Sequence, residues 1–305
     1  MTRLLLGAGG FRGALDGLET GLESAWSIAR RLRTGYSGAI IRARRSSDNA
    51  ESDFSAGSDG AVSPAEVAAW AGAGDAFLTT IYGQSGLSRN LTQSTTTLQP
   101  TIVSSGSALT RNGRLICRGT TASPRRMAVA SSTALYNFLH TTGGTLYTVC
   151  QSNDTAARKP ILATCSSLSA QPGVLIMSSS SEGIEIRTSR LDVAGVATNG
   201  NSISFTPGGT TSLDLRLMSI YLDPDNGTAA NRAIPWHNGT LGTGSNASTG
   251  TPFVENAGGN LTIMDYVAGS TPYDGDFGEL VIWSGDRTAD RTVWEASARA
   301  FWGTP

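Results

Sequence analysis

The chain has 305 residues, and its 23 basic and 24 acidic side chains give a formal net charge of −1 at pH 7. This balance excludes a strong overall field that would draw the protein to nucleic acid or to an anionic membrane. Only 15% of the residues are charged, whereas glycine alone contributes 37. Such a composition is typical of a β-protein with many tight turns and not of a helical or disordered chain.

The chain begins MTRLLLGAGGFRG, in which three consecutive leucines form the longest apolar run. This run is too short for a secretory signal or a membrane span, so we expect no membrane insertion. We interpret residues 1–20 as an arm that docks on a partner. From Asp16 to Arg33 the apolar residues recur at intervals of three and four, which predicts an amphipathic helix that ends before Gly35.

The next stretch, RRLRTGYSGAIIRARRSSDNAESDF (30–54), is rich in arginine. Asp48, Glu51 and Asp53 are close enough in sequence to pair with these arginines, so we interpret the stretch as a solvated surface with internal ion pairs. No aromatic residues alternate with the arginines and no recognition helix is present, so we expect no nucleic-acid partner. Contact with an acidic partner subunit is the alternative that remains open.

A second, short helix is predicted at Ser63-Pro64-Ala65-Glu66, because Ser is a good N-cap, Pro suits the first helical position and Glu completes a capping box. Gly72 ends this helix.

Beyond about residue 98 the apolar period changes to two, as in GIEIRTS (183–189) and LTIMDYVAG (261–269), which predicts strands. Asn-Gly pairs at 226 and 238 indicate hairpin turns, and many short strands between glycine-rich turns favour a sandwich.

The last predicted element is a helix that Thr288 would cap. One side of it is an apolar stripe of Trp294, Ala298, Phe301 and Trp302, and we expect this stripe to pack on the sandwich. The charged residues between them, which are Arg291, Glu295 and Arg299, are expected to stay in water.

The cysteines and histidines are too few and too scattered for a metal site. Cys117, Cys150 and Cys165 fit buried free thiols better than a disulfide framework. His140 and His237 lie almost a hundred residues apart, so we expect no metal and no cofactor. The segment 223–227, DPDNG, offers oxygen ligands for calcium, but it lacks the spacing of a calcium loop and a hairpin turn is the preferred interpretation.

Several stretches resemble known families. Residues 98–122, 215–244 and 274–303 resemble the opening, middle and closing strands of concanavalin A-like, laminin-G-like jelly rolls. Residues 30–54 and GAGDAFLTTIYGQSGLSRNLTQ (72–93) resemble the start of the arabinofuranosidase-B-like domain, which occurs in fungal glycosidases and in tail or other virion proteins of bacteriophages. The family pattern YDQSG is replaced here by Tyr82-Gly83-Gln84-Ser85-Gly86, so a carboxylate is absent at position 83.

This resemblance implies an all-β, concanavalin A-like jelly-roll sandwich with an N-terminal helical segment and a short C-terminal helix. Residues 21–305 would form a single domain, in which 21–97 are a helical, wrapping subregion and 98–305 are the sandwich core. In such a domain the arginine-rich run would lie on a helix and the strand that follows it.

Carboxylates near the closing strands are the candidates for catalysis. A retaining glycosidase needs two carboxyl groups about 5 Å apart, one as the nucleophile and one as the acid. Asp265, Asp274, Asp276 and Glu279 are nearest to these strands, and Asp276 and Glu279 are the catalytic candidates. The alternative is that they are loop acids that satisfy turn amides. The family's catalytic pair could not be assigned to named positions.

Sugar binding has its own candidates. An aromatic ring can stack on the apolar face of a pyranose while neighbouring polar groups bind its hydroxyls. Trp236 precedes His237 and Asn238, and Tyr273 precedes Asp274, on what we interpret as loops. The alternative is packing at the rim of the sandwich, since single surface aromatics are ordinary.

From these features we predict a structural or adhesive protein of a tailed bacteriophage, on the tail or capsid surface. We favour this prediction over an enzyme. The predicted partners are other virion proteins, further copies in a homo-oligomer and host surface polysaccharide, and the predicted location is the virion, assembled in the host cytoplasm. The alternative is an arabinofuranosidase-like glycoside hydrolase that acts on surface polysaccharide. A carbohydrate-binding module outside any particle is a third possibility.

Overall fold

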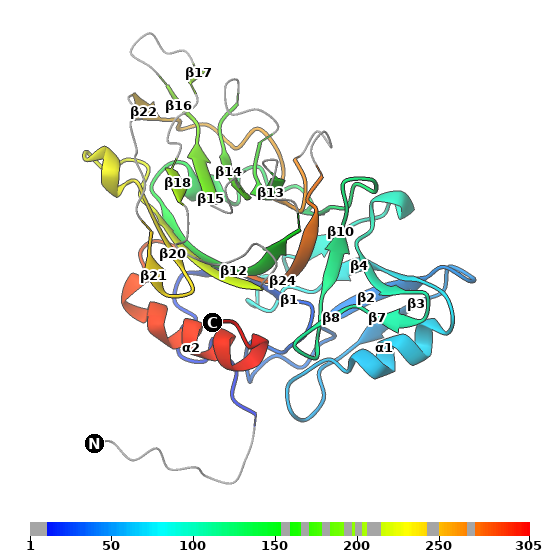
Figure 1. Ribbon diagram of the computed structural model, residues 1–305. Coiled ribbons are helices and arrows are strands. Elements are labelled where there is room, and N and C mark those ends of the chain that lie inside the picture. Colours follow the sequence, from blue (N-terminus) through cyan, green and yellow to red (C-terminus); the bar gives the residue numbers. More distant parts are fainter. Residues whose placement is uncertain are drawn as a thin grey trace, which may run out of the picture.

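The computed structural model describes residues 11–153, 159–165, 171–178, 184–191, 197–198, 203–205, 215–242, 250–266 and 272–305. These residues form a sandwich of two strand layers with the helix α2 (Arg291–Trp302) on its outside (Figure 1). We call the layer beneath α2 the helix-side layer. Its strands are β1 (Leu22–Ser27), β10 (Cys117–Gly119), β12 (Gly144–Ser152), β19 (Arg216–Leu222), β20 (Ala233–His237), β21 (Thr240–Leu241) and β24 (Gly275–Ser284).

The second layer, called the outer layer, is built from antiparallel neighbours. Their order is β18 (Ile203–Phe205), β15 (Ile184–Thr188), β14 (Val174–Ser178), β13 (Lys159–Ala163), β23 (Thr262–Ile263), β11 (Met127–Val129), β5 (Leu91–Thr92), β4 (Ala76–Ile81), β2 (Ile41–Arg45) and β3 (Glu51–Phe54). The strand β6 (Thr101–Ser104) pairs with both β4 and β10, and therefore connects the two layers.

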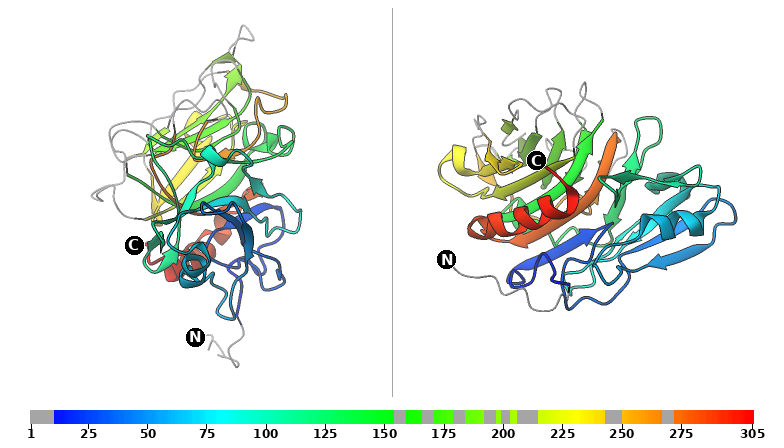
Figure 2. Two further views of the ribbon diagram at one scale, coloured as in Figure 1. Left: turned by 90° about the vertical axis from the view of Figure 1, so that its right-hand side faces the viewer. Right: turned by 60° about the horizontal axis from the view of Figure 1, so that its bottom comes forward.

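Short elements complete the described fold. These are α1 (Pro64–Ala71), β7 (Ser107–Ala108), β8 (Thr110–Arg111), β9 (Arg114–Leu115), β16 (Arg190–Leu191), β17 (Ala197–Thr198), β22 (Thr251–Pro252) and 3-10 turns at Thr96–Leu98, Asn137–Leu139, Ala229–Asn231 and Thr288–Asp290. Figure 2 shows α2 lying along the helix-side layer, while α1 and β2 to β4 occupy another end of the molecule. No described helix is both long and apolar enough to cross a bilayer.

The main core lies between the two layers and continues beneath α2. Between the layers, Ile220 of β19 and Ile176 of β14 belong to one buried cluster. Beneath α2, Trp294 stacks on Trp283 of β24 at 4.8 Å and on Tyr147 of β12 at 6.1 Å between ring centroids. Aromatic rings at these separations bury much apolar surface and attract each other further. They therefore fix the helix against the layer.

The predicted helix over Asp16–Arg33 is wrong. The segment instead contains β1, which pairs antiparallel with β24 so that Trp26 lies opposite Leu280. Every residue from Ser24 to Arg30 is buried, because neighbouring segments cover both faces of this strand. A strand buried on both faces shows no alternation, and its apolar residues can imitate helical spacing. The N-terminal helical segment of the predicted fold is therefore absent, and the arginine-rich run lies on β2 without a helix before it.

The other two predicted helices are present. The hydroxyl of Ser63 caps α1 by accepting a hydrogen bond from the backbone N–H of Glu66 at 3.2 Å, and Gly72 ends the helix. Asp290, and not Thr288, is the N-cap of α2. Glu295 was expected to be in water but is buried, because the hydroxyl of Ser219 donates to it at 2.8 Å from the underlying strand.

The arginine-rich run is internally paired only in part, because Arg30 binds Glu279 outside the run and Arg44 is buried against neutral side chains. Arg42 binds Asp53 through two hydrogen bonds of 2.8 Å, and Arg45 binds Asp48 at 2.7 and 2.8 Å.

The three cysteines are free and buried, which confirms that prediction. Residues 1–10 of the predicted docking arm lie outside the described part of the chain. Leu15, which follows them, is fully buried in the core.

Candidate functional site

Glu279, a predicted catalytic candidate, lies in the structural core beneath α2. Its carboxylate accepts two hydrogen bonds from Arg30, at 2.6 and 2.7 Å, and one from the Tyr147 hydroxyl at 2.7 Å. The indole of Trp302 donates a further bond at 3.2 Å. Burial raises the pKa of Tyr147 far above its usual value, and the Glu279 carboxylate raises it further. The tyrosine therefore stays a neutral donor, and this network joins the segment that follows β1 to β12, β24 and α2.

Asp276, the other catalytic candidate, is also fully buried and held by arginines. Arg118 donates to it at 2.6 and 3.0 Å, and Arg111 donates at 2.7 Å. A carboxylate bound by two guanidinium groups has few lone pairs left for a substrate. The geometry of Asp276 and Glu279 fits structural ion pairs and does not fit the loop acids that were the sequence-based alternative.

The first group of predicted sugar-binding residues lies at the end of β20. Trp236 is half-buried, and its ring is covered by the Arg291 guanidinium at 4.9 Å. His237 is buried on the opposite face of the strand, and burial, with the nearby charge of Arg216, lowers its pKa to about 4. Asn238 bonds the backbone of Leu217 and has a φ of 46°, as an Asn-Gly turn requires. These contacts fit rim packing.

The second group, Tyr273 and Asp274, precedes β24, which β12 and β19 separate from β20. Burial raises the pKa of Tyr273 well above its usual value, and its ring belongs to the core, so it presents no open face for a sugar. Asp274 accepts the hydroxyl and the backbone N–H of Thr121 at 2.6 and 3.2 Å. The five predicted sugar-binding residues are therefore not brought together in one site.

A different set of residues gathers on the face of the outer layer that points away from the main core. Ile184 and Ile186 of β15 belong to the main core, so the residue between them, Glu185, lies on the opposite face. Glu185 pairs across the strands with Met177 of β14, and Arg187 pairs with Leu175. This face carries a second apolar cluster, which consists of Ala163, Cys165, Leu175 and Met177 with Tyr266 packed against them.

Two buried carboxylates border this cluster. Glu185 is fully buried and accepts a hydrogen bond of 2.6 Å from Nε of Arg187. Asp265 follows β23, is also fully buried, and accepts the backbone N–H of Tyr266 at 2.7 Å. The Tyr266 hydroxyl lies 3.3 Å from the sulfur of Met177. Tyr266, next to Asp265, packs against the cluster, and Met177 of the cluster pairs across the strands with Glu185. Each acid therefore lies next to a residue of the same apolar cluster.

The alternation in GIEIRTS already implied that Glu185 and the two isoleucines face opposite sides of the sheet. Asp265 was named among the acids near the strands. What the sequence could not supply was the order of the strands, which places β23, β13, β14 and β15 side by side. Within the described residues no group of three or more His, Cys, Asp or Glu side chains is arranged to hold a metal ion.

Comparisons with known proteins point to carbohydrate-active enzymes. Residues 16–159 match the family model described as the catalytic domain of alpha-L-arabinofuranosidase B. No curated protein matches the sequence. Solved structures include an arabinofuranosidase complexed with arabinofuranosyl-alpha-1,2-xylobiose, at 17% identity and a TM-score of 0.63, with 92% of this chain and 63% of that chain covered. An α-L-arabinofuranosidase of glycoside hydrolase family 54, soaked with a cyclic sulfate inhibitor, is 17% identical and has a TM-score of 0.61. The match covers 92% of this chain and 63% of that chain.

These findings correct the functional prediction. The prediction of a phage structural or adhesive protein is wrong, as is the expectation that the chain is not an enzyme, because the matching family model is a glycosidase catalytic domain and no match indicates a phage origin. The predicted alternative, a glycoside hydrolase, agrees with the findings. The chain spans 63% of the length of the arabinofuranosidases that it resembles. It has the sheet-rich fold of these carbohydrate-active enzymes.

Proposed function

We propose that the protein is a glycoside hydrolase that releases α-L-arabinofuranosyl groups from a polysaccharide. The observation that carries this proposal is the match of residues 16–159 to the arabinofuranosidase B catalytic domain. The fold supports it, because 92% of the chain superposes on an arabinofuranosidase. We assign the sandwich to the concanavalin A-like type as part of the same proposal.

The site that we propose for this reaction is the apolar cluster of the outer layer with its two carboxylates. Hydrolysis of a glycosidic bond requires one carboxylic acid to protonate the leaving oxygen and one carboxylate to act as nucleophile or base. We assign Glu185 to the nucleophile or base, because a hydrogen bond of 2.6 Å from Arg187 holds its carboxylate in place. We assign Asp265 to the acid, because it is fully buried next to Tyr266 of the apolar cluster.

The other buried carboxylates among the described residues are poor candidates for this chemistry. Arg30 binds Glu279, Arg111 and Arg118 bind Asp276, and Arg291 and Arg299 of α2 bind Glu295. These three acids are held in ion pairs away from the second apolar cluster. Glu185 and Asp265 differ in position: Glu185 pairs across the strands with Met177 of the second apolar cluster, and Asp265 precedes Tyr266, which packs against that cluster.

The proposal is tested by the products that purified protein releases from arabinoxylan, arabinan and an arabinose-free xylan. We expect free arabinose from the first two and no sugar from the third. The control is Asp274→Asn, which alters an acid outside the proposed site and should leave the release unchanged. Binding of arabinoxylan without release of arabinose from any of these polymers would contradict hydrolysis.

A further inference from the structure

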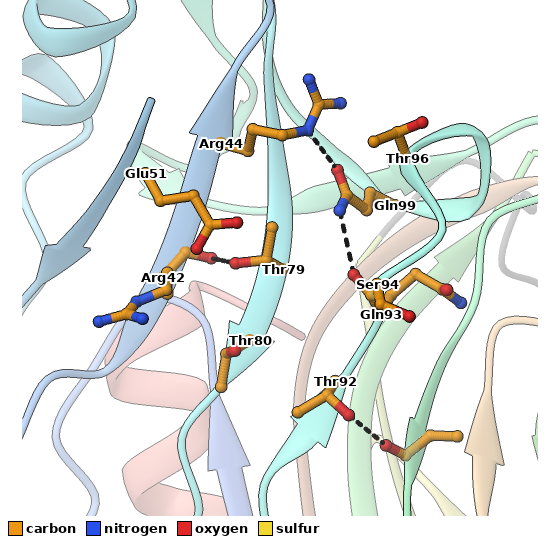
Figure 3. A pocket seen from close by; sticks show the side chains of 11 residues that line it. Arg42, Arg44, Glu51, Thr79, Thr80, Thr92, Gln93, Ser94, Thr96 and Gln99 are labelled. Carbon is orange, nitrogen blue, oxygen red and sulfur yellow. Dashed lines mark hydrogen bonds between the residues drawn. The ribbon is translucent and has the colours of Figure 1, made fainter. Parts of the chain in front are cut away.

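A cavity of about 510 Å³ lies on the outer layer where β2, β3, β4 and β5 meet the segment 93–99 (Figure 3). Its volume falls within the range of ligand sites, roughly 300–1,000 Å³. Ala128 forms part of its wall and pairs in the sheet with Thr262, which in turn pairs with Ala163 of the second apolar cluster. The cavity and the second apolar cluster therefore share one continuous face of the outer layer.

One wall of the cavity carries a buried positive charge. Arg44 is only 9% exposed. Its guanidinium donates to two neutral side chains, to Oε1 of Gln99 at 2.8 Å and to Oδ1 of Asn49 at 2.7 Å, and lies over the ring of Phe77. None of the ion pairs among the described residues includes Arg44, whereas Arg42 and Arg45 on the same strand each bind an aspartate.

A buried cation that meets only neutral acceptors is costly, and a bound anion would offset that cost. A second guanidinium, that of Arg125, lies over the same Phe77 ring at 5.3 Å. Burial and the charge of Arg44 lower the pKa of Arg125, although Asp75 acts in the opposite direction. Arg44 lines the cavity, and Arg125 lies close to it without lining it, so both add positive charge near this end of the cavity. Arginine is the residue best shaped to bind a carboxylate through two hydrogen bonds.

The rest of the cavity presents groups that bind hydroxyls. The side-chain hydroxyls of Thr80, Ser94 and Thr96 line the cavity and make no hydrogen bond to other described residues. Figure 3 shows Glu51 and Arg44 projecting into different parts of the cavity. The Glu51 carboxylate can accept a hydrogen bond from a sugar hydroxyl, but it would repel a multiply charged anion such as a phosphate.

We propose that this cavity binds a uronic-acid unit of the polysaccharide, with the sugar carboxylate on Arg44 and its hydroxyls on Thr80, Ser94, Thr96 and Glu51. The inference that the unit belongs to a polysaccharide rests on the proposed function, whereas the recognition of an acidic sugar rests on the cavity alone. The bound unit would hold an acidic, arabinose-bearing chain along the face that carries Asp265 and Glu185.

Binding is measured by NMR titration of the full chain with methyl glucuronide, methyl glucoside and sodium sulfate. We expect methyl glucuronide to bind at least about tenfold more tightly than the neutral glycoside, with sulfate weaker than both. Arg44→Gln should abolish this preference. Arg45→Gln is the matched control, since Arg45 lies on the same strand, binds Asp48 and is outside the cavity, and it should keep the preference.

If Arg44→Gln does not fold, the pair Thr80→Val and Ser94→Ala tests the same cavity from its partly exposed side, and each should weaken glucuronide binding severalfold. Equal binding of the neutral and acidic glycosides, or sulfate binding as tight as the glucuronide, would overturn the proposal. Asp265→Asn should retain glucuronide binding. An absence of arabinose release with intact glucuronide binding would therefore count against the proposed function and not against this site.

Discussion

Some buried charges in this protein stabilise the fold and others belong to the proposed binding and catalytic sites. The contacts of each side chain show to which group it belongs. Glu279 stabilises the fold, because four donated hydrogen bonds from Arg30, Tyr147 and Trp302 surround it. Glu279→Gln would leave Arg30 buried without its counter-charge, so we expect a loss of about 3–5 kcal/mol in the free energy of unfolding. Urea denaturation measures this loss. A loss below about 1 kcal/mol would show that the ion pair is not structural.

His237 predicts a dependence of stability on pH. Its pKa is lowered to about 4 in the folded protein, from 6.5, by burial and by the charge of Arg216. Below pH 6.5 the unfolded chain therefore takes up a proton that the folded chain does not, and stability falls as the pH decreases. Between pH 6.5 and 5 the loss from this group should be about 1–2 kcal/mol. His237→Asn should reduce the slope in chemical denaturation across this range, and an unchanged slope would contradict the prediction.

Sequence patterns located those elements whose signals are local. The capping box at Ser63 and the stripe of Trp294, Ala298, Phe301 and Trp302 depend on neighbouring residues, and both helices are found. The strand β1 was missed because its conformation depends on β24, more than 250 residues away in sequence. The direction of Glu185 followed from the alternation in its strand. Its proximity to Tyr266 and Asp265 followed only from the order of strands that are distant in sequence.

The bulge in β24 predicts an effect at the scale of the element. The register of β12 against β24 shifts between Val149 and Cys150, and Gly278 is the extra residue in β24. A Cβ atom there would lie 2.7 Å from the ring of Trp302 on α2. Gly278→Ala should therefore displace the helix and cost about 1–3 kcal/mol in the free energy of unfolding.

Gly227→Ala is the control for this change, because a Cβ at position 227 meets nothing within 4 Å. Thermal unfolding of both variants, with tryptophan fluorescence as a report on Trp302, compares them directly. Equal melting temperatures for the two variants would mean that α2 does not depend on the bulge.

At the scale of the whole molecule, the two faces of the sandwich have different roles. The helix-side layer carries α2 and the buried hydrogen bonds that hold it, from Trp302 to Glu279 and from Ser219 to Glu295. The outer layer carries, on one continuous face, the polar cavity at β2 to β5 and the acids that border the apolar cluster. This division agrees with a fold that binds an extended substrate across one sheet. The predictions of a homo-oligomer, of virion partners and of assembly in a host cytoplasm stay predictions.

The most direct test of the central claim is the rate of hydrolysis of 4-nitrophenyl α-L-arabinofuranoside by the protein, by Asp265→Asn and by Glu185→Gln, with Asp274→Asn as the control. We predict that the unmodified protein and the control hydrolyse the substrate at similar rates and that the two site variants lose at least about a hundredfold in kcat while remaining folded. Hydrolysis that persists in both site variants would contradict the assignment of the acids. The absence of hydrolysis by the unmodified protein would contradict the proposed activity itself.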